Sequence, residues 1–372
     1  MKNGPSSSTR TVGHARATTM KDIARALGLS QSTVSRVLSG APSVVPIAAE
    51  TRERVLVEAR RRAYRPNPLA SGLRGARTRL LGAIMGEILG PFAAGAMDAI
   101  TAEANALGYN TVLGNAHGQA DEAMAIRTVL ETRHCDAILL IGDTREQPRL
   151  LEDLRKTALP LVALWQGVAL DGISTVNVDN RLGATCVLEH LGGLGHRQVG
   201  FVGIANRQGD INQRKLAYRA FMSKIGEEVP DGFIEEVVHH PAGGAEAAHR
   251  MLRLPERPTA IFCASDVLAI GALHAAQNLG LRVPGDVSIV GFDDISFAAY
   301  TVPALTTIHM PMAEMVRLAV QEALRPDVGD AVKNFSLLPA LVIRQSSGRV
   351  PAQRRAPAAH RSIGSSRPGL SR

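Results

Sequence analysis

The chain has 372 residues, of which 45% are hydrophobic and 20% are charged. This composition excludes a largely disordered chain, and the length allows two or three domains of ordinary size. Fifteen Lys and Arg against four Asp and Glu give residues 1–79 a net charge of +11. Residues 349–372 add six Arg and no acidic residue, so residues 80–348 carry −9 within the formal total of +8. A basic head on an acidic body predicts a polyanionic partner for the head alone.

Residues 1–17 are rich in Gly, Ser, Thr and Arg, which predicts a disordered basic extension. This segment has no apolar core, so we do not expect a secretory signal. No run in the chain approaches the apolar length of a membrane-spanning helix, and we expect no membrane partner. The three cysteines, Cys135, Cys186 and Cys263, are far apart. They predict reduced thiols in a cytoplasmic protein.

Residues 18–40, TTMKDIARALGLSQSTVSRVLSG, contain two short helical patterns separated by a turn. Thr19 is the predicted N-cap of the first helix, and Gly28 tolerates the positive φ that a sharp turn requires. The apolar residues of the first pattern recur at helical spacing: Met20, Ile23, Ala24 and Leu27. The second pattern begins at Ser30, another N-cap type.

The second helix is expected to bury a narrow seam of Val34, Val37 and Leu38. Its other face carries amide, hydroxyl and guanidinium groups without a carboxylate, which suits contacts to base edges and phosphates in the major groove. A small solvated helix pair would have a similar composition, but the short glycine-containing turn favours a helix-turn-helix. The expected DNA contacts of this region are Thr19, Ser30, Gln31, Ser32, Thr33, Ser35 and Arg36.

The string KDIARALGLSQSTVSRVLSG closely resembles the DNA-binding headpiece of the lactose repressor (LacI/GalR) family of bacterial regulators. The match is specific, because TVSRVLSG after an ALGLS-type turn is the signature of that family. The headpiece is then expected at residues 18–66, with a third helix at 48–63. Val55 and Ala59 would lie along one side of this helix, and Leu56 would close the core.

Residues 67–79 correspond to the hinge of the similar family, which folds on operator DNA and inserts a leucine into the minor groove. The resemblance assigns this insertion to Leu73 and further DNA contacts to Tyr64, Asn67 and Arg74. An apolar wedge can kink the duplex while the segment folds on binding. Gly72 departs from a good helix former, and a simple linker leucine at position 73 is the alternative.

From Leu80 onward, short apolar runs alternate with longer amphipathic segments in two similar halves. This rhythm predicts doubly wound parallel sheets with helices on both faces. The predicted strands are 80–85, 111–113, 137–141, 161–164, 175–178, 198–202, 261–263, 288–292 and 338–344. The predicted helices are 92–106, 122–133, 147–157, 181–194, 212–225, 244–252 and 267–279. We expect the chain to return to the first half after residue 307, before the last strand.

The similar family uses a two-lobed periplasmic-binding-protein fold as its effector domain. Its landmarks stand in order here, including GHR at 195–197, PTAIF at 258–262 and GFDD at 291–294. The resemblance therefore implies an all-α helix-turn-helix headpiece joined to an α/β two-lobed body at residues 80–348. Residues 349–372 contain no leucine heptad, so we expect a disordered basic tail and a homodimer rather than a tetramer.

The sequence contains no constellation that indicates catalysis. Neither GxGxxG nor GxxxxGK[ST] follows a predicted strand, and none of the eleven His has metal-ligand spacing. Asp293 and Asp294 are adjacent, so their carboxylates should point in opposite directions and should not share a proton. We therefore expect no enzyme activity, no cofactor and no metal site.

We expect a ligand site where the carboxyl ends of the strands meet a cleft between the lobes. Trp165, the only tryptophan, follows the strand at 161–164 and offers a π-face to a sugar ring or planar ligand. The similar family most often has aspartate at this position, which predicts a different ligand or pose. A tryptophan that packs under a loop is the alternative. Phe92 is expected to form the opposite wall.

The resemblance and the strand ends assign three further ligand contacts. Arg214 matches the family's effector-binding arginine, which can fork onto hydroxyls or a carboxylate; a surface arginine is the alternative. Asp293 matches an acidic contact to ligand hydroxyls. Asp266 follows the strand at 261–263 and either contacts the ligand or caps the next helix.

These features predict a ligand-responsive repressor of a carbohydrate or related catabolic operon that binds a pseudo-palindromic operator as a homodimer. The effector would be a sugar, a sugar acid or a similar metabolite, acting either as inducer or as corepressor. It would change the angle between the lobes and, through the hinges, the affinity for DNA. The alternative is a solute-binding protein without DNA function, which the basic head disfavours.

Overall fold

The computed structural model of the chain describes residues 18–39, 46–64, 77–85, 90–115, 135–142, 148–205, 209–325 and 331–350, with Thr128 and Leu130 between them. The chain forms two compact units, residues 1–78 and 79–372, so the division falls at the end of the predicted hinge. The predicted extension and the predicted DNA contacts Asn67, Leu73 and Arg74 lie outside the described residues. So do most of the predicted tail and most of the predicted helix 122–133.

The N-terminal unit, which we call the headpiece, contains the helices α1 (Met20–Leu27), α2 (Gln31–Ser39) and α3 (Ala49–Arg61). Thr19 begins α1 through a capping box: its hydroxyl accepts from the amide of Asp22 at 3.3 Å, and its own amide donates to the Asp22 carboxylate at 2.9 Å. Gly28 ends α1 in the left-handed conformation, with φ of 66°. The predicted N-cap and turn are confirmed.

Six buried side chains from all three helices form the headpiece core: Ile23, Ala24, Val34, Val37, Val55 and Ala59. The predicted inner faces of the first two helices are therefore confirmed. The prediction that Leu56 closes this core is wrong, because Leu56 is 39% exposed. One residue turns the helix by about 100°, so Leu56 points away from the face that carries Val55 and Ala59.

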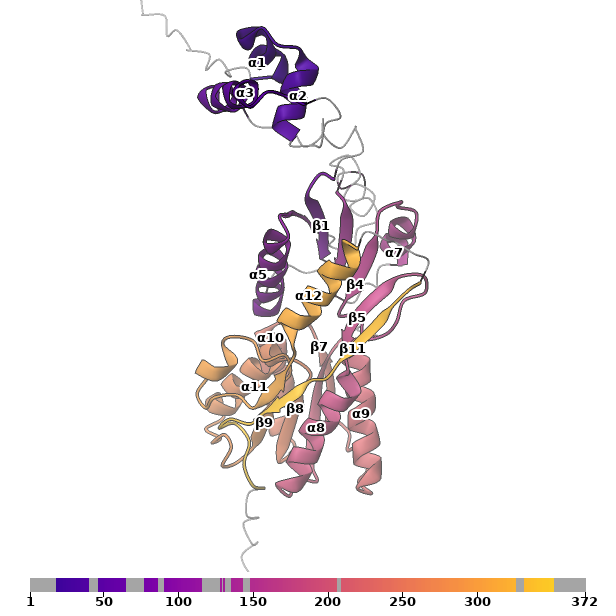
Figure 1. The fold of residues 1–372 in the computed structure, drawn as a ribbon. Coiled ribbons are helices and arrows are strands. Elements are labelled where there is room, and N and C mark those ends of the chain that lie inside the picture. The colour runs from indigo at the N-terminus through magenta and orange to yellow at the C-terminus, as the bar shows by residue number, and fades with distance from the viewer. Residues whose placement is uncertain are drawn as a thin grey trace, which may run out of the picture. The chain divides into compact units, whose positions relative to one another are not determined.

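The first lobe of the body is built on a six-stranded sheet in the order β11-β5-β4-β3-β1-β2, in which all pairs are parallel. Its strands are β1 (Leu80–Met85), β2 (Asn110–Asn115), β3 (Ala137–Ile141), β4 (Leu161–Leu164), β5 (Ser174–Val178) and β11 (Asn334–Leu337). The helices α5 (Pro91–Ala106) and α12 (Met312–Ala323) contact each other and pack on the sheet, and α7 (Pro148–Arg155) packs on its other face (Figure 1).

The strands of this sheet alternate between two apolar layers. In β3, Leu139 and Ile141 pack in the large core with α5 and α12, whereas Ile138 and Leu140 pack with α7. Successive side chains of a strand point to opposite faces, so helices on both faces bury every residue of β3. The predicted doubly wound sheet is thus confirmed in this lobe.

The second lobe contains a parallel sheet in the order β7-β6-β8-β9. Its strands are β6 (Val199–Ile204), β7 (Ile234–Val237), β8 (Ala260–Cys263) and β9 (Ser288–Val290). The helices α8 (Asn180–Gly193) and α9 (Asp210–Lys224) contact each other and lie on one side, and α10 (Pro241–Leu252) and α11 (Asp266–Asn278) form a second pair (Figure 1). A two-stranded antiparallel sheet joins β10 (Thr307–His309) to β12 (Ala340–Val342), and a 3-10 turn spans Ala298–Tyr300.

The chain returns to the first lobe after β10, as predicted, because α12 packs against α5, β4 and β5. The predicted last strand at 338–344 is confirmed as β12, which is shorter and pairs with β10. The strand before it, β11, pairs with β5 in the first lobe and was not predicted. Pro339 separates the two short strands, since proline has no amide hydrogen for a ladder. In the part of the chain that the structure describes, no helix is both long and apolar enough to span a membrane.

Candidate functional site

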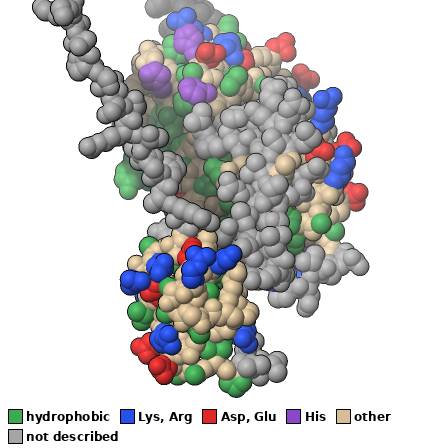
Figure 2. Space-filling view, turned by 90° about the horizontal axis from the view of Figure 1, so that it is seen from above, with side chains coloured by type: hydrophobic (Ala, Val, Ile, Leu, Met, Phe, Trp, Pro, Cys, Tyr) green, Lys and Arg blue, Asp and Glu red, His purple; other side chains and the backbone are tan. Residues whose placement is uncertain are grey.

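Helix α2 has one buried and one accessible face. Val34 is fully buried and Val37 is 3% exposed, whereas Gln31 and Ser32 are exposed. The other polar residues of this helix that the sequence singled out are half-buried: Thr33, Ser35 and Arg36. Seen in Figure 2, the side chains on the surface of the headpiece include more Lys and Arg than Asp and Glu. The helix therefore presents hydrogen-bonding groups from a basic unit.

Two further predicted DNA contacts have structural roles in the headpiece: Ser30 before α2 and Tyr64 after α3. The hydroxyl of Ser30 accepts from the amide of Thr33 at 3.1 Å, which caps α2. It also lies 2.8 Å from the hydroxyl of Ser32. Tyr64 is half-buried against the headpiece core. Ser30 therefore holds the start of α2, and Tyr64 adds to the headpiece core.

The body brings three of the five predicted ligand residues to the junction between its lobes, and a fourth, Phe92, packs against one of them. We define the interlobe junction as residues 165–167 of the first lobe with Gly209, Asp210, Arg214 and Asp293 of the second. Trp165 follows β4 and is only 4% exposed. Its ring meets Phe92 edge to face, with centroids 5.1 Å apart and planes at 77°. The two rings therefore form one wall, and the prediction that Phe92 lies on the opposite wall is wrong.

The indole nitrogen of Trp165 is buried and has no hydrogen-bond partner. A buried donor without an acceptor costs about 1–3 kcal/mol, so most buried donors in proteins are paired. Trp165 also has a φ of 56°, which is unusual for a large side chain. Trp165 therefore combines an unpaired buried donor with a strained backbone at the carboxyl end of β4.

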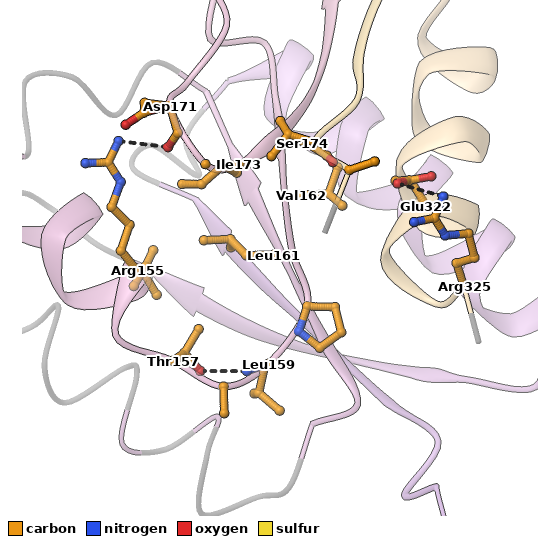
Figure 3. Close-up of a pocket in the computed structure, with 16 residues that line it drawn as sticks. Arg155, Thr157, Leu159, Leu161, Val162, Asp171, Ile173, Ser174, Glu322 and Arg325 are labelled. Carbon is orange, nitrogen blue, oxygen red and sulfur yellow. Dashed lines mark hydrogen bonds and ion pairs between the residues drawn. The ribbon is translucent and has the colours of Figure 1, made fainter. Parts of the chain in front are cut away.

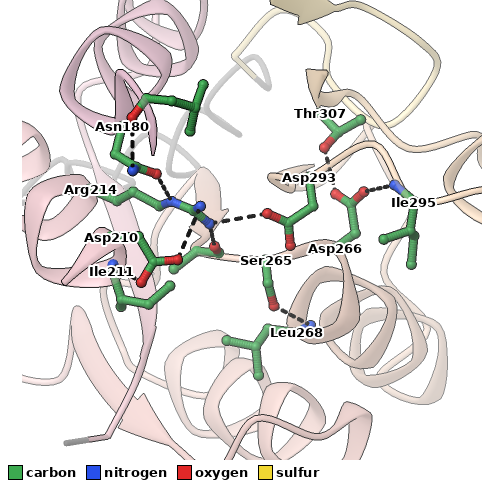
Figure 4. Close-up of polar contacts among 12 residues, drawn as sticks. Asn180, Asp210, Ile211, Arg214, Ser265, Asp266, Leu268, Asp293, Ile295 and Thr307 are labelled. Carbon is green, nitrogen blue, oxygen red and sulfur yellow. Dashed lines mark hydrogen bonds and ion pairs between the residues drawn. The ribbon is translucent and has the colours of Figure 1, made fainter. Parts of the chain in front are cut away.

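The second lobe contributes an ionic cluster around Arg214 (Figure 4). Arg214 is 1% exposed, and its Nε donates to Oδ1 of Asn180 at 2.9 Å. One Nη donates to the carbonyl of Ala264 and lies 3.4 Å from Oδ1 of Asp293, while the other is 3.6 Å from Asp210. Because these partners engage all three of its nitrogen atoms, Arg214 orients the carboxylates in this conformation.

The guanidinium of Arg214 also lies over the ring of Phe292, 3.5 Å from its centroid. A cation over an aromatic face is attracted by the negative face of the ring. Arg214 carries one positive charge against the two carboxylates of Asp210 and Asp293. The cluster therefore has a surplus of acceptors, which suits hydroxyl or amine donors better than a ligand carboxylate.

Asp266 lies behind this cluster and is completely buried. Its carboxylate accepts from the hydroxyl of Thr307 at 2.5 Å and from the amide of Ile295 at 2.9 Å. Ser265, rather than Asp266, caps α11, because its hydroxyl accepts from the amide of Leu268. Asp266 thus supports the loop that carries Asp293.

Burial raises the pKa of Asp293 to about 6, although the charge of Arg214 opposes the shift. Burial also raises the pKa of Asp266 well above its usual value, and the nearby charge of Asp293 adds to this effect. Asp293 and Asp294 face different partners, since Asp294 pairs with Arg344 at 2.6 Å. This agrees with the expectation that the adjacent carboxylates do not share a proton.

Several polar residues that shape the junction were not predicted from the sequence. Gln166 is fully buried and donates to the carbonyls of Gly142 and Leu164. Asn177 and Asn180 lie at the carboxyl end of β5, where they hold the loop after β4 and Arg214, respectively. Their sequence signal is their position: Asn177 is the last polar residue of β5, and Asn180 follows the end of that strand by two residues.

A cavity of about 620 Å³ lies at the amino ends of β4 and β5, and Figure 3 shows the side chains that line it. Apolar side chains form its floor, and charged ones stand at its sides. Its lining includes Arg155, Leu159, Leu161, Ile173, Glu322 and Arg325. None of the five predicted ligand residues lines it, so this cavity is separate from the interlobe junction. Among the described residues, no group of three or more His, Cys, Asp or Glu could hold a metal ion.

Two family models match the chain. Residues 19–67 match the bacterial regulatory proteins of the lacI family, and residues 188–347 match a periplasmic binding protein-like domain. The chain is 32% identical to catabolite control protein A of Priestia megaterium over 82% of this chain and 90% of that protein. It is 31% identical to the transcriptional repressor PurR of Proteus mirabilis (strain HI4320), over 88% and 96%, respectively.

Solved structures of similar proteins include complexes with DNA and with sugars. The Lac repressor dimer bound to operator and the anti-inducer ONPF has a TM-score of 0.79 at 25% identity, covering 90% of this chain and all of that one. The complex of the transcriptional regulator CelR with cellobiose has a TM-score of 0.64 at 25% identity. It covers 89% of this chain and all of that one.

Proposed function

The chain belongs to the LacI family of bacterial regulatory proteins, and from this we propose that it represses a carbohydrate or related catabolic operon. It is a DNA-binding transcriptional regulator that responds to a small ligand and binds its operator as a dimer. A solute-binding protein without DNA function does not fit the match to the DNA-binding family. Because its curated relatives are regulators, we assign no catalysis to the chain and place it in the cytoplasm with its DNA.

The two faces of α2 give DNA binding its strongest support. The buried seam of Val34 and Val37 fixes the helix to the headpiece, which leaves Gln31 and Ser32 exposed. The side-chain amide of Gln31 can form two hydrogen bonds with one base edge. The hydroxyl of Ser32 can bond either to a donor or to an acceptor in the groove. Arg36 adds a cation for a base or a phosphate. In the proposed complex, Leu73 and Arg74 of two hinges occupy the centre of the operator.

An apolar surface on the second lobe supports the homodimer. Phe297 is 58% exposed, Tyr300 is 83% exposed and Val302 is 93% exposed, all within the loop that precedes β10. Monomeric proteins rarely leave several large apolar side chains exposed together. A two-fold axis places the same surface on both subunits, so each loop could cover the other. We assign the dimer contact of the second lobe to this loop.

The effector site is assigned to the interlobe junction. Lac repressor has been solved with ONPF and CelR with cellobiose, which supports a sugar-like effector here. Trp165 and Phe92 would pack on the apolar face of the ring, while Asp293 would accept from hydroxyls and Arg214 would hold Asp293 in place. Asp266 would act indirectly, through the loop that it supports.

Binding of the full-length chain to random and palindromic duplexes tests DNA recognition. We expect a palindromic site to be selected. The logarithm of the binding constant should fall linearly with the logarithm of the salt concentration, because binding releases counterions from the phosphates. Gln31→Ala should relax the preference at one base pair by about 1–3 kcal/mol. Lys224→Ala, which removes a charge on the body, is the matched control and should leave binding unchanged. Equal affinity for all duplexes would contradict the proposal.

A further inference from the structure

Gly167 lies where the main chains of the two lobes come into direct contact. A Cβ atom at this position would be 2.2 Å from the amide nitrogen of Asp210 and 2.6 Å from its Cα. It would also be 2.5 Å from the carbonyl carbon of Gly209. These are main-chain atoms at the start of α9, so no side chain can rotate away to make room. Only a glycine at position 167 fits this distance between the lobes.

The loop that carries Gly167 is held firmly by the first lobe. Asn177 on β5 is 8% exposed, and its Oδ1 accepts from the amide of Gln166 at 2.9 Å and from that of Gly167 at 3.1 Å. The Asn177 side-chain amide donates to the carbonyl of Val168 at 3.1 Å. The loop cannot yield to a new side chain without breaking these bonds.

On the second lobe, the residue that Gly167 contacts, Asp210, is itself part of the ionic cluster around Arg214. Asp210 is the first residue of α9, and its carboxylate lies 3.6 Å from Arg214 one turn later. Arg214 in turn lies 3.4 Å from Asp293. On the first lobe, Trp165 is only two residues before Gly167. A ligand between Trp165 and Asp293 would therefore bind beside the contact that limits the approach of the lobes.

We propose that Gly167 determines how far the two lobes close and that the effector acts on DNA affinity through this contact. The limit on the distance between the lobes follows from the atoms around Gly167 alone. The effect of this limit on DNA affinity rests on the proposed function. A methyl group at position 167 would stop the lobes before they reach the observed distance. Effector binding and lobe closure would then be uncoupled, although each lobe would remain folded.

Two other glycines show the difference between a contact within a lobe and one between lobes. A Cβ at Gly271 would be 1.9 Å from the carbonyl oxygen of Pro241, and one at Gly244 would be 2.2 Å from that of Leu268. Both contacts join α10 to α11 in the core of the second lobe, where overlap would disturb folding. The contact of Gly167, in contrast, joins a loop of the first lobe to the start of α9 in the second, so a Cβ there would act between the lobes.

The test compares Gly167→Ala with Gly172→Ala in the full-length chain. Both glycines have a φ of 71°, so alanine introduces the same backbone strain at either position. A Cβ at Gly172 meets no atom within 4 Å, which isolates the steric effect at Gly167. The interlobe distance is measured by pulsed electron resonance between spin labels at Asn105→Cys on α5 and Ser223→Cys on α9. Both positions are exposed, and Cys186→Ala removes the one cysteine that is not buried.

Labelled chains are mixed with excess unlabelled chains, so each dimer carries a single labelled copy. We expect the wild type and Gly172→Ala to share a short-distance population that Gly167→Ala lacks. Equal distance distributions in the two alanine variants would overturn the proposal. So would a melting temperature of Gly167→Ala far below that of Gly172→Ala, which would indicate a folding contact. Neither measurement uses DNA or effector, so its failure is distinct from a failure of the proposed repressor function.

Discussion

On the first lobe, the interlobe junction consists of an aromatic pair and a hydrogen-bonded loop, whereas on the second lobe it consists of a guanidinium shared between carboxylates. Phe92 and Trp165 contact each other but leave the indole donor unpaired. Arg214, in contrast, contacts protein acceptors through all three nitrogen atoms of its guanidinium. The aromatic pair, the first wall, keeps an unpaired buried donor, whereas the cluster around Arg214, the second wall, is a closed network.

This difference separates ligand recognition from stability. The indole nitrogen of Trp165 makes no hydrogen bond, so a substitution that removes it breaks none. A buried ion pair that loses one member leaves an uncompensated charge, so the second wall is tied to the folding of its lobe. Substitutions on the second wall should therefore mainly lower the free energy of unfolding, and substitutions on the first wall should mainly lower ligand affinity.

The largest effect is expected for Arg214→Ala. Removing this buried guanidinium leaves the half-buried carboxylates of Asp210 and Asp293 without their cation, which should lower the free energy of unfolding by about 3 kcal/mol. Urea titration of the full-length chain measures this loss. Arg197→Ala is the control, because Arg197 pairs with Glu227 at the surface, where such pairs contribute about 1 kcal/mol or less. Equal losses in the two variants would contradict a closed network on the second wall.

A smaller effect is expected from the titration of Asp293, whose pKa is about 6 in the folded chain. Since this value lies above that of the unfolded chain, about 3.9, the folded state binds more protons between these pH values. Stability should therefore fall as pH rises from about 4 to 6, by at most about 3 kcal/mol.

Asp293→Asn should remove this part of the pH dependence while keeping an oxygen for Arg214. Urea unfolding at pH 4.5 and pH 7 measures the difference between wild type and variant. We expect the variant to gain stability relative to the wild type at the higher pH. Parallel pH profiles of the two proteins would show that Asp293 is not held in an unfavourable charged state.

The smallest effect on stability is expected for Trp165→Phe on the first wall. This change keeps an aromatic ring against Phe92 but removes the unpaired donor, so the free energy of unfolding should change by about 1 kcal/mol or less. The affinity for a sugar that raises the melting temperature of the wild type should fall about tenfold, which corresponds to about 1.4 kcal/mol. Calorimetric titration with that sugar measures the change. Unchanged affinity would mean that the indole only packs under its loop.

Local patterns in the sequence predict most of the strands and helices and the position of Trp165 after β4. The apolar run of β4 places Trp165 at the carboxyl end of a strand, and the capping residues around Gly28 predict the helix-turn-helix. Strand β7 was not predicted, because Glu235 and Glu236 make it look polar. It is an edge strand whose two glutamates pair with Arg250 and Lys215.

The contacts across the junction could not be predicted in the same way. The pairing of Phe92 with Trp165 joins α5 to the end of β4, and Asn180 reaches Arg214 from a different helix. Such contacts depend on how helices pack on the sheets, which hydrophobic periodicity does not specify. The close approach at Gly167 depends further on how one lobe meets the other. A glycine in a loop sequence indicates only that a left-handed conformation is permitted.

The most direct test of a ligand-controlled repressor is the affinity of the full-length chain for its selected palindromic site, measured with and without a stabilising sugar. Coupled sites in proteins typically change each other's affinity by 5- to 150-fold. We expect a change of at least about fivefold in the dissociation constant for the operator. An operator affinity that stays the same at saturating sugar would contradict control of the headpiece by the body.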